Sequence, residues 1–221
     1  MPKYKAVIFD LDGTLLDTLE DIADSMNAVC DKNGFPPHGL EAYKRFIGDG
    51  IAQLVARSFP ENHRSDEQIL QGVEDVRAEY AKRWSCKTRI FPGIDILLDE
   101  LTAKSTKMCV LSNKPDDFTQ KSVSHYLSRW SFDVVYGKFP DIPAKPDPTL
   151  ALKIMDQLEL PSESILYLGD THTDMETAIN AGFTAVGALW GFRDEAELKR
   201  SGAAHLIQKP QELLSLIHGD V

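Results

Sequence analysis

The chain of 221 residues lacks the features that mark membrane proteins and disulfide-rich secreted proteins. No apolar run approaches the ~20 residues needed to span a bilayer. The N-terminal MPKYKAVIFD has only four consecutive apolar residues before an acid, which favours a strand over a signal peptide. Cys30, Cys86 and Cys109 are odd in number and no two lie at metal-ligand spacing, so we expect reduced thiols. We therefore expect a cytoplasmic protein that has no membrane partner.

Positive charge is also scarce, because 24 Lys and Arg stand against 34 Asp and Glu, which gives a formal net charge of −10. Such a surface repels nucleic acid, so we expect no nucleic-acid partner. It also repels a phosphate ester at long range. An anionic substrate would need local attraction from a metal ion, a lysine or main-chain N–H groups.

Several short apolar runs do not alternate with polar residues, which indicates strands buried on both faces of a parallel sheet. Between them lie helical patterns such as that of Ile94, Leu97, Leu98 and Leu101. Strands that alternate with helices predict a doubly wound, Rossmann-like α/β domain. The expected strands are Ala6–Phe9, Met108–Leu111, Val134–Tyr136, Ile165–Leu168 and Ala185–Leu189.

One segment interrupts this rhythm with helices alone. Thr18 and Asp21 resemble a capping box, and further helices are expected over 39–47, 51–58 and 66–84. We expect an all-helical insertion at 17–86, placed after the first strand, and a core formed by 1–16 and 87–221. Two connections tie the insertion to the core, so it could move as a lid.

Four acids follow two of the expected strands. Asp10 and Asp12 follow the first strand, and Gly13 lets the chain turn sharply after them. Asp170 follows a later strand, and Asp174 would lie on the first turn of a helix that begins near Thr171. Ligands bind outside the carboxyl ends of strands in open α/β sheets, and carboxylates suit Mg²⁺. Asp174 could instead be a favourable charge at a helix N-terminus. His172 is expected to be an exposed loop residue rather than a ligand.

Two further segments carry groups that can bind anions. Ser112 and Asn113 end a strand before a helix, where a hydroxyl and main-chain N–H groups form an anion cradle or an ordinary helix cap. Lys114 follows them directly and is a candidate for substrate contact. Lys145 lies in a proline-rich segment just before a helix; it could offset the charge of the acids or be a solvated surface lysine.

These segments, taken in this order, resemble the haloacid dehalogenase-like hydrolase superfamily. Asp10–Thr14 matches the first motif, Ser112 the second, Lys145 the third, and Gly169-Asp170 with Asp174 the fourth. The match spans nearly the whole chain. The helical insertion resembles the small helical cap of that superfamily.

The resemblance implies a Mg²⁺-dependent phosphatase. Asp10 would attack phosphorus and form an aspartyl-phosphate, while Asp12 would act as general acid and then as general base. Lys145 would neutralise negative charge on the nucleophile and on the transferring group, and Ser112 and Asn113 would hold the phosphoryl group. The implied metal ligands are Asp10, the main-chain carbonyl of Asp12 and Asp170, while Asp174 would either bind the metal directly or orient its water ligands. Thr14 and Lys114 are expected to be on the substrate side.

The insertion is expected to select the substrate. Gly48 and Gly50 could bring a turn close to the site, and Arg45 and Arg57 could bind a substrate carboxylate or be solvated. Several runs are similar to phosphoglycolate phosphatases, which makes phosphoglycolate the first candidate among small phosphorylated metabolites. These runs are Leu15–Thr18, Gly48–Gly50, Ser112–Pro115 and Lys145–Pro148. The oligomeric state is expected to be a monomer or a homodimer.

Other functions remain open. Asp12 argues against carbon–halogen hydrolysis, because no leaving-group oxygen then needs a proton. A sugar-phosphate mutase or a pyrophosphatase of the same fold would share the motifs. A phosphonate hydrolase would need a reactive lysine in the insertion, where Lys32, Lys44 and Lys82 have no distinctive setting. A non-catalytic phosphate-binding regulatory protein, such as a receiver-like module, is the alternative from another class.

Overall fold

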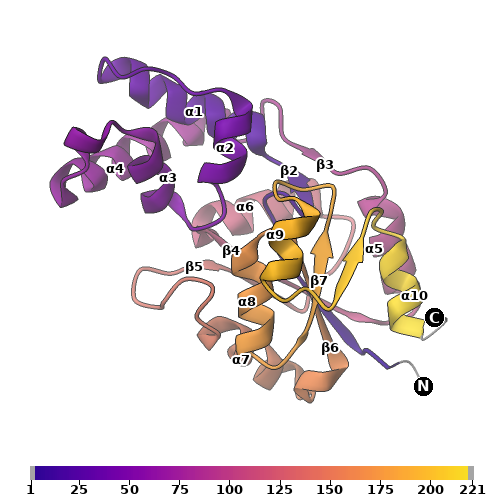
Figure 1. Cartoon of the computed structure of the whole chain (residues 1–221). Helices are drawn as coiled ribbons and strands as arrows, with labels where there is room; N and C mark the ends of the chain where they lie inside the picture. The colour runs from indigo at the N-terminus through magenta and orange to yellow at the C-terminus, as the bar shows by residue number, and fades with distance from the viewer. Residues whose placement is uncertain (1–2, 219–221) are drawn as a thin grey trace. The chain divides into compact units, whose positions relative to one another are not determined.

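The computed structural model describes residues 3–218 (Figure 1). The chain divides into two units. The core unit contains the residues up to Leu16 together with those from Ile90 onward, and the helical unit contains Asp17–Arg89.

The core unit is built on a six-stranded sheet in which all paired strands are parallel. In chain order its strands are β1 (Ala6–Phe9), β4 (Lys107–Pro115), β5 (Val134–Lys138), β6 (Ile165–Gly169), β7 (Thr184–Ala188) and β8 (His205–Ile207). Their spatial order is β5-β4-β1-β6-β7-β8. Phe9 at the end of β1 lies between Val110 and Leu168, so the carboxyl ends of the three central strands are close to one another. The predicted parallel α/β sheet is confirmed, with β8 as an additional strand.

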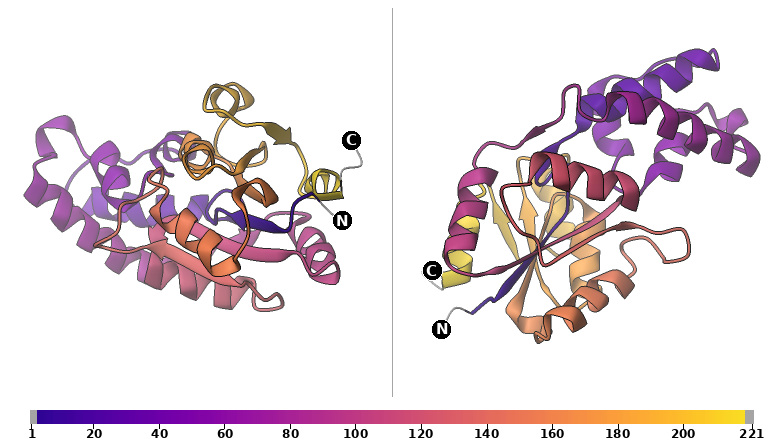
Figure 2. Two further views of the ribbon diagram at one scale, coloured as in Figure 1. Left: turned by 90° about the horizontal axis from the view of Figure 1, so that it is seen from below. Right: turned by 180° about the vertical axis from the view of Figure 1, so that it is seen from behind.

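Helices cover both faces of this sheet. On one face the described helices are α5 (Ile94–Ala103), α6 (Asp116–Tyr126) and α10 (Glu212–His218), with α5 and α10 side by side (Figure 2). On the other face they are α7 (Thr149–Leu158), α8 (His172–Asn180) and α9 (Glu195–Arg200), and a short 3₁₀ turn, η2 (Ser162–Ser164), precedes β6. Phe9 is buried in the first layer and its neighbour Ile8 in the second. Burial on both faces explains why the strands show no apolar–polar alternation.

The helical unit contains the helices that the periodicity predicts. They are α1 (Leu19–Lys32), α2 (Leu40–Phe46), α3 (Ile51–Ser58) and α4 (Asp66–Arg83), with a 3₁₀ turn, η1 (Glu61–His63), before α4. Both α1 and α3 pack against α4. The Ser65 hydroxyl and the Gln68 side chain cap α4 reciprocally. Among the helices that the structure describes, none is long and apolar enough to cross a membrane.

The connections between the two units pair with each other. They form the two-stranded ladder of β2 (Leu16–Asp17) and β3 (Arg89–Ile90), and Arg89 forms an ion pair of 2.7 Å with Asp17. The predicted capping box at Thr18 is wrong, because the Thr18 side chain makes no cap hydrogen bond. The Asp21 carboxylate instead accepts hydrogen bonds of 2.8–3.0 Å from the N–H groups of Lys87 and Thr88 and from the Thr88 hydroxyl.

Candidate active site

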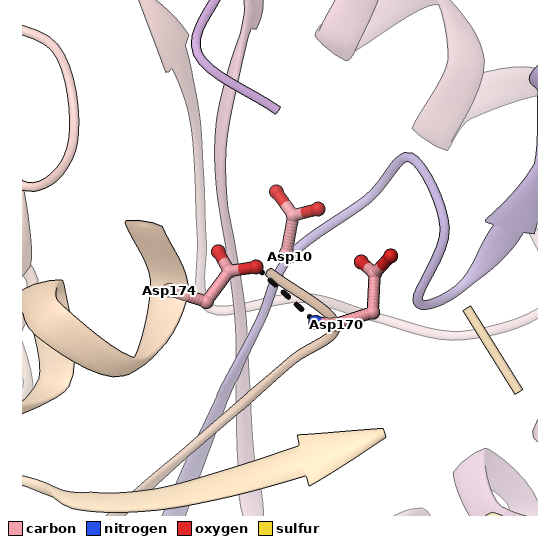
Figure 3. A group of neighbouring side chains, drawn as sticks. All are labelled: Asp10, Asp170 and Asp174. Atoms are coloured by element: carbon pink, nitrogen blue, oxygen red, sulfur yellow. Dashed lines mark hydrogen bonds between the residues drawn. The ribbon is translucent and has the colours of Figure 1, made fainter. Parts of the chain in front are cut away.

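Three buried carboxylates meet where β1 and β6 end. Asp10 follows β1, Asp170 follows β6, and Asp174 lies on the first turn of α8. One oxygen from each lies within 4.8 Å of the others, and the three groups point to the same side of the segments that carry them (Figure 3). Asp174 Oδ2 accepts hydrogen bonds from the N–H groups of Asp170 (3.2 Å) and Thr171 (3.0 Å). Asp174 is therefore both a helix-capping residue and a member of the acidic cluster.

Lys145 lies within this cluster rather than on the surface. Its Nζ donates to Asp10 Oδ1 at 2.7 Å and to Asp174 Oδ1 at 2.6 Å. The Leu111 carbonyl and the Tyr167 hydroxyl each lie 3.1 Å from the same Nζ. The interpretation of Lys145 as a solvated lysine is excluded, because its side chain is only 4% exposed.

The side chain of Asn113 holds the main chain of Lys145. Asn113 Nδ2 donates to the Lys145 carbonyl at 3.1 Å, and the Lys145 N–H donates to Asn113 Oδ1 at 2.9 Å. Both polar atoms of this amide bind the main chain of Lys145, and a contact of Asn113 with the phosphoryl group remains a prediction. The Asn113 side chain therefore holds the main-chain segment from which the Lys145 side chain reaches the cluster.

The cluster contains more negative than positive charge. Burial raises the pKa of Asp10 to about 7; the Asp174 charge adds to this rise and Lys145 opposes it. Burial, followed by the charges of Asp174 and Asp10, raises the pKa of Asp170 well above its usual value. Burial alone would lower the pKa of Lys145, but Asp10 and Asp174 raise it well above its usual value, so the lysine is charged.

These residues fit a magnesium ion. Three carboxylates face one ammonium group, so full ionisation leaves two negative charges without compensation. The donors are hard oxygen atoms from two strand ends and one helix start, which is the ligand type that Mg²⁺ prefers. Asp10, Asp170 and Asp174 would hold the ion. The carboxylate of Asp12 is not part of this group among the described residues, and its carbonyl remains a predicted ligand.

The turn after Asp12 packs against Asp170. Gly13 has φ +95°, and a Cβ atom there would lie 2.3 Å from Asp170 Oδ2, so only glycine fits. The Thr14 hydroxyl donates to Asp170 Oδ1 at 2.9 Å. Thr14 was expected on the substrate side, but its hydroxyl is bound to the acidic cluster.

Asp12 is held by a second buried lysine. Lys114 Nζ lies 2.9 Å and 3.1 Å from the two carboxylate oxygens of Asp12. Strand β4 continues to Pro115 through a register shift after Leu111, and α6 begins at Asp116. Ser112 and Asn113 therefore belong to the strand, and the alternative that they form an ordinary cap of the following helix is excluded, because Pro115 precedes α6. The Ser112 hydroxyl accepts the Lys114 N–H at 3.3 Å, and a substrate contact of Lys114 remains a prediction.

The predicted specificity residues lie in the helical unit. Gly48 and Gly50 have φ +120° and +88°, so the turn between α2 and α3 has a backbone that favours glycine. Arg57 holds this turn through an ion pair of 2.5 Å with Asp49 and a hydrogen bond of 3.0 Å to the Phe46 carbonyl. Arg45 is exposed. Substrate contact by Arg45, Gly48 and Gly50 remains a prediction.

Sequence reasoning missed several residues at the site. Tyr167 is a polar side chain in an aliphatic strand, and that was the available signal. Trp190 and Phe192 carried no comparable signal. The Trp190 indole N–H donates to the Thr14 carbonyl at 3.0 Å, and the Phe192 main-chain N–H donates to Asp170 Oδ2 at 2.8 Å. His172 is the first residue of α8 rather than a loop residue, and its ring contacts Glu197 at 3.1 Å.

Several known proteins resemble the chain along nearly its whole length. A phosphoglycolate phosphatase of Aquifex aeolicus is 28% identical over 217 residues, which cover 98% of each chain. A phosphoglycolate phosphatase of Pseudomonas fluorescens is 29% identical over 223 residues, covering 95% of this chain and 78% of its own. A crystal structure of a candidate phosphoglycolate phosphatase from Lactobacillus delbrueckii subsp. bulgaricus is 30% identical with a TM-score of 0.90, covering 98% of this chain and 99% of its own.

The family comparison agrees with this fold and with the acidic cluster. The sequence profile described as haloacid dehalogenase-like hydrolase matches residues 7–188, from the first strand to the end of β7. That range contains Asp10, Lys145, Asp170 and Asp174. The chain therefore belongs to the haloacid dehalogenase-like hydrolases.

Proposed function

We propose that this protein is a Mg²⁺-dependent phosphatase that hydrolyses a small phosphate monoester through an aspartyl-phosphate on Asp10. The observation that carries the proposal is the position of the Asp10 carboxylate. It is buried at the end of β1, bound to Lys145 and close to Asp170 and Asp174. A carboxylate in this setting can act as a nucleophile once the surrounding charge is balanced.

Asp10 and Asp12 carry the covalent chemistry in this proposal. An Asp10 carboxylate oxygen attacks phosphorus, the P–O bond to the leaving group breaks, and Asp12 gives its proton to the leaving oxygen. Asp12 then takes a proton from water as the water attacks phosphorus and releases the Asp10 carboxylate. Lys114 holds the Asp12 side chain in the free protein, and protonation of Asp12 requires that this ion pair loosens when substrate binds.

The other residues balance charge and fix positions. A bound Mg²⁺ would offset the negative charge of the acids and of the phosphoryl group. Lys145 bridges Asp10 and Asp174, so it fixes the direction from which Asp10 attacks and offsets charge that develops on the transferring group. Ser112 would hold a phosphoryl oxygen, and Asn113 keeps Lys145 in place through its main chain.

Phosphoglycolate is the proposed first substrate. It is supported by the similarity to proteins named phosphoglycolate phosphatase at 26–29% identity, which is modest. Arg45 and the turn at Gly48 and Gly50 are the proposed selectivity elements of the helical unit. Phosphoglycolate carries a carboxylate in addition to its phosphate, and a cation such as Arg45 could bind that carboxylate.

A panel of phosphate esters, assayed with Mg²⁺ and with EDTA, tests the proposal. The panel contains phosphoglycolate, sugar phosphates, pyrophosphate and an aryl phosphate, and phosphate release and sugar-phosphate isomers are both measured. We expect Mg²⁺-dependent release, with the highest kcat/KM for phosphoglycolate. Isomer formation without release would indicate a mutase, and activity that EDTA leaves unchanged would refute the metal requirement.

Rapid quenching tests the covalent intermediate. An acyl phosphate on Asp10 should be trapped in acid as an adduct on the peptide that contains Asp10, and hydroxylamine should cleave it. The Asp10→Asn variant should show no adduct. An adduct on another residue would assign the nucleophile elsewhere.

A further inference from the structure

The Asp170 carboxylate is enclosed by two segments that sequence reasoning did not connect. The Thr14 hydroxyl donates to Oδ1 at 2.9 Å, and the Phe192 main-chain N–H donates to Oδ2 at 2.8 Å. A Cβ atom at Gly191 would lie 2.3 Å from Asp170 Cβ, so the loop after β7 lies directly against this side chain. Both carboxylate oxygens therefore have a donor within the protein.

Among the described residues, Trp190 has no hydrogen bond to Asp170 itself, but it is hydrogen-bonded to Thr14, one of the residues that hold Asp170. Its indole Nε1–H donates to the Thr14 carbonyl at 3.0 Å. The hydroxyl of Thr14 is also the donor to Asp170 Oδ1. The indole therefore restrains Thr14, and Thr14 in turn orients the Asp170 carboxylate. Trp190 is half-buried against the apolar layer that contains Phe9 and Leu168, which restrains its ring.

We infer that Trp190 is a positioning residue for the metal site and acts through Thr14 on the orientation of Asp170. This inference rests on the proposed function, because it assumes that Asp170 is a Mg²⁺ ligand. Mg²⁺ demands near-ideal octahedral geometry, so a small rotation of one ligand weakens binding. Groups that orient metal ligands typically change metal affinity about 10- to 100-fold when they are replaced.

Calorimetric titration of the metal-free protein with Mg²⁺ tests the inference without an activity assay. Trp190→Phe keeps an aromatic ring and removes the N–H donor. We expect it to weaken Mg²⁺ binding about threefold to tenfold, less than the about 10- to 100-fold loss expected for Thr14→Val, which removes the direct donor to Asp170. In the Thr14→Val background, Trp190→Phe should change the affinity by less than about twofold, because the two residues act in one chain.

Trp130→Phe is a matched control. The Trp130 indole also donates one partly buried hydrogen bond, of 2.7 Å, to Asp99 Oδ1 on α5, and among the described residues it has no hydrogen bond to the acids of the cluster. It should leave Mg²⁺ affinity unchanged, while thermal unfolding shows that all variants remain folded.

Three results would overturn the inference: wild-type affinity in Trp190→Phe, an equal loss in Trp130→Phe, or full additivity with Thr14→Val. A wild-type protein that binds no Mg²⁺ would instead refute the metal site of the proposed function.

Discussion

The two units of the chain bury charged side chains in different ways. In the described part of the core unit, such residues gather near the ends of the central strands or in the loop after β7; they are Asp10, Lys114, Lys145, Asp170, Asp174 and Arg193. In the helical unit, Asp21 is the one charged side chain that is buried among the described residues. Its carboxylate accepts hydrogen bonds from two main-chain N–H groups and a hydroxyl.

The difference lies in how completely each buried charge is compensated by its surroundings. Asp21 is solvated by donors of its own unit, so it needs nothing from outside. Asp10 and Asp170 have raised pKa values, chiefly because burial disfavours their charged forms and neighbouring acids add to that effect. An incompletely balanced buried cluster destabilises the folded state, and such clusters are typical of sites that bind a cation or carry out chemistry.

Replacement of Asp10 should give the largest effect. Asp10→Asn should reduce kcat by at least about 10⁴-fold, since the nucleophile is lost, a loss of at least about 5.5 kcal/mol of transition-state stabilisation. The metal-free variant should be at least as stable as the wild type, because one of three repelling carboxylates is gone. Steady-state kinetics and urea unfolding measure both. A variant that is inactive and strongly destabilised would show that Asp10 stabilises the fold, and would contradict the view that the acidic cluster is incompletely balanced.

The pH dependence of the free energy of unfolding should reveal the ionisation of Asp10. Between about pH 4 and pH 7 the folded protein keeps a proton on Asp10 that the unfolded chain releases, because burial raises its pKa to about 7. The free energy of unfolding of the metal-free protein should therefore fall as the pH rises through this window, by up to about 4 kcal/mol. Urea unfolding of the wild type and of Asp10→Asn isolates this contribution as their difference, and a pH-independent difference would show that Asp10 is already ionised.

In the helical unit, the buried Asp21 carboxylate should stabilise the folded state, whereas the Asp10 carboxylate is expected to destabilise it. Asp21→Ala leaves the N–H groups of Lys87 and Thr88 without their acceptor, so we expect a destabilisation of about 3 kcal/mol. Asp24→Ala is the control, because its ion pair of 2.8 Å with Lys87 is exposed and should contribute less than about 1 kcal/mol. Mg²⁺ affinity should stay unchanged in both variants. Equal destabilisation by the two substitutions would refute the stabilising role assigned to the hydrogen bonds that Asp21 accepts from Lys87 and Thr88.

The smallest effect is expected at the turn of the helical unit. Arg57→Ala removes a partly exposed ion pair with Asp49, so stability should change by less than about 1 kcal/mol. The turn at Gly48 and Gly50 would become less ordered, and KM for the best substrate should rise about fivefold, equivalent to about 1 kcal/mol. Kinetics together with Mg²⁺ titration separate these effects. A change in Mg²⁺ affinity would contradict the prediction that Arg57 acts only through the turn at Gly48 and Gly50.

Local patterns predicted much of the fold. The uninterrupted apolar run of Ala6–Phe9 predicted a doubly buried strand, and the helical periodicity predicted α3 with its observed bounds. The three-residue β8 was missed because a run of that length has no recognisable period. The convergence of Asp10 and Asp170 was predicted because parallel strands bring their carboxyl ends to one edge. Lys145 precedes a helix instead, and its place beside these acids was implied by the family resemblance.

Side-chain hydrogen bonds between distant residues were not predictable in this way. Asp21 meets residues 66 and 67 positions away, and Trp190 meets Thr14 across 176 positions. The polar atoms of Asn113 face the main chain of Lys145 rather than open space. Each of these contacts depends on where the fold places a partner, and composition and periodicity do not report that placement.

The ladder of β2 and β3 has a consequence for how such a chain can diversify. The Phe91 N–H donates to the Leu15 carbonyl at 3.1 Å, so the polypeptide leaves and re-enters the core at adjacent points. A short turn could join these ends without disturbing the six-stranded sheet, since closing so small a gap has little entropic cost. Another module could thus replace the insertion while the core keeps its scaffold, and under the proposed function this exchange would change substrate selectivity.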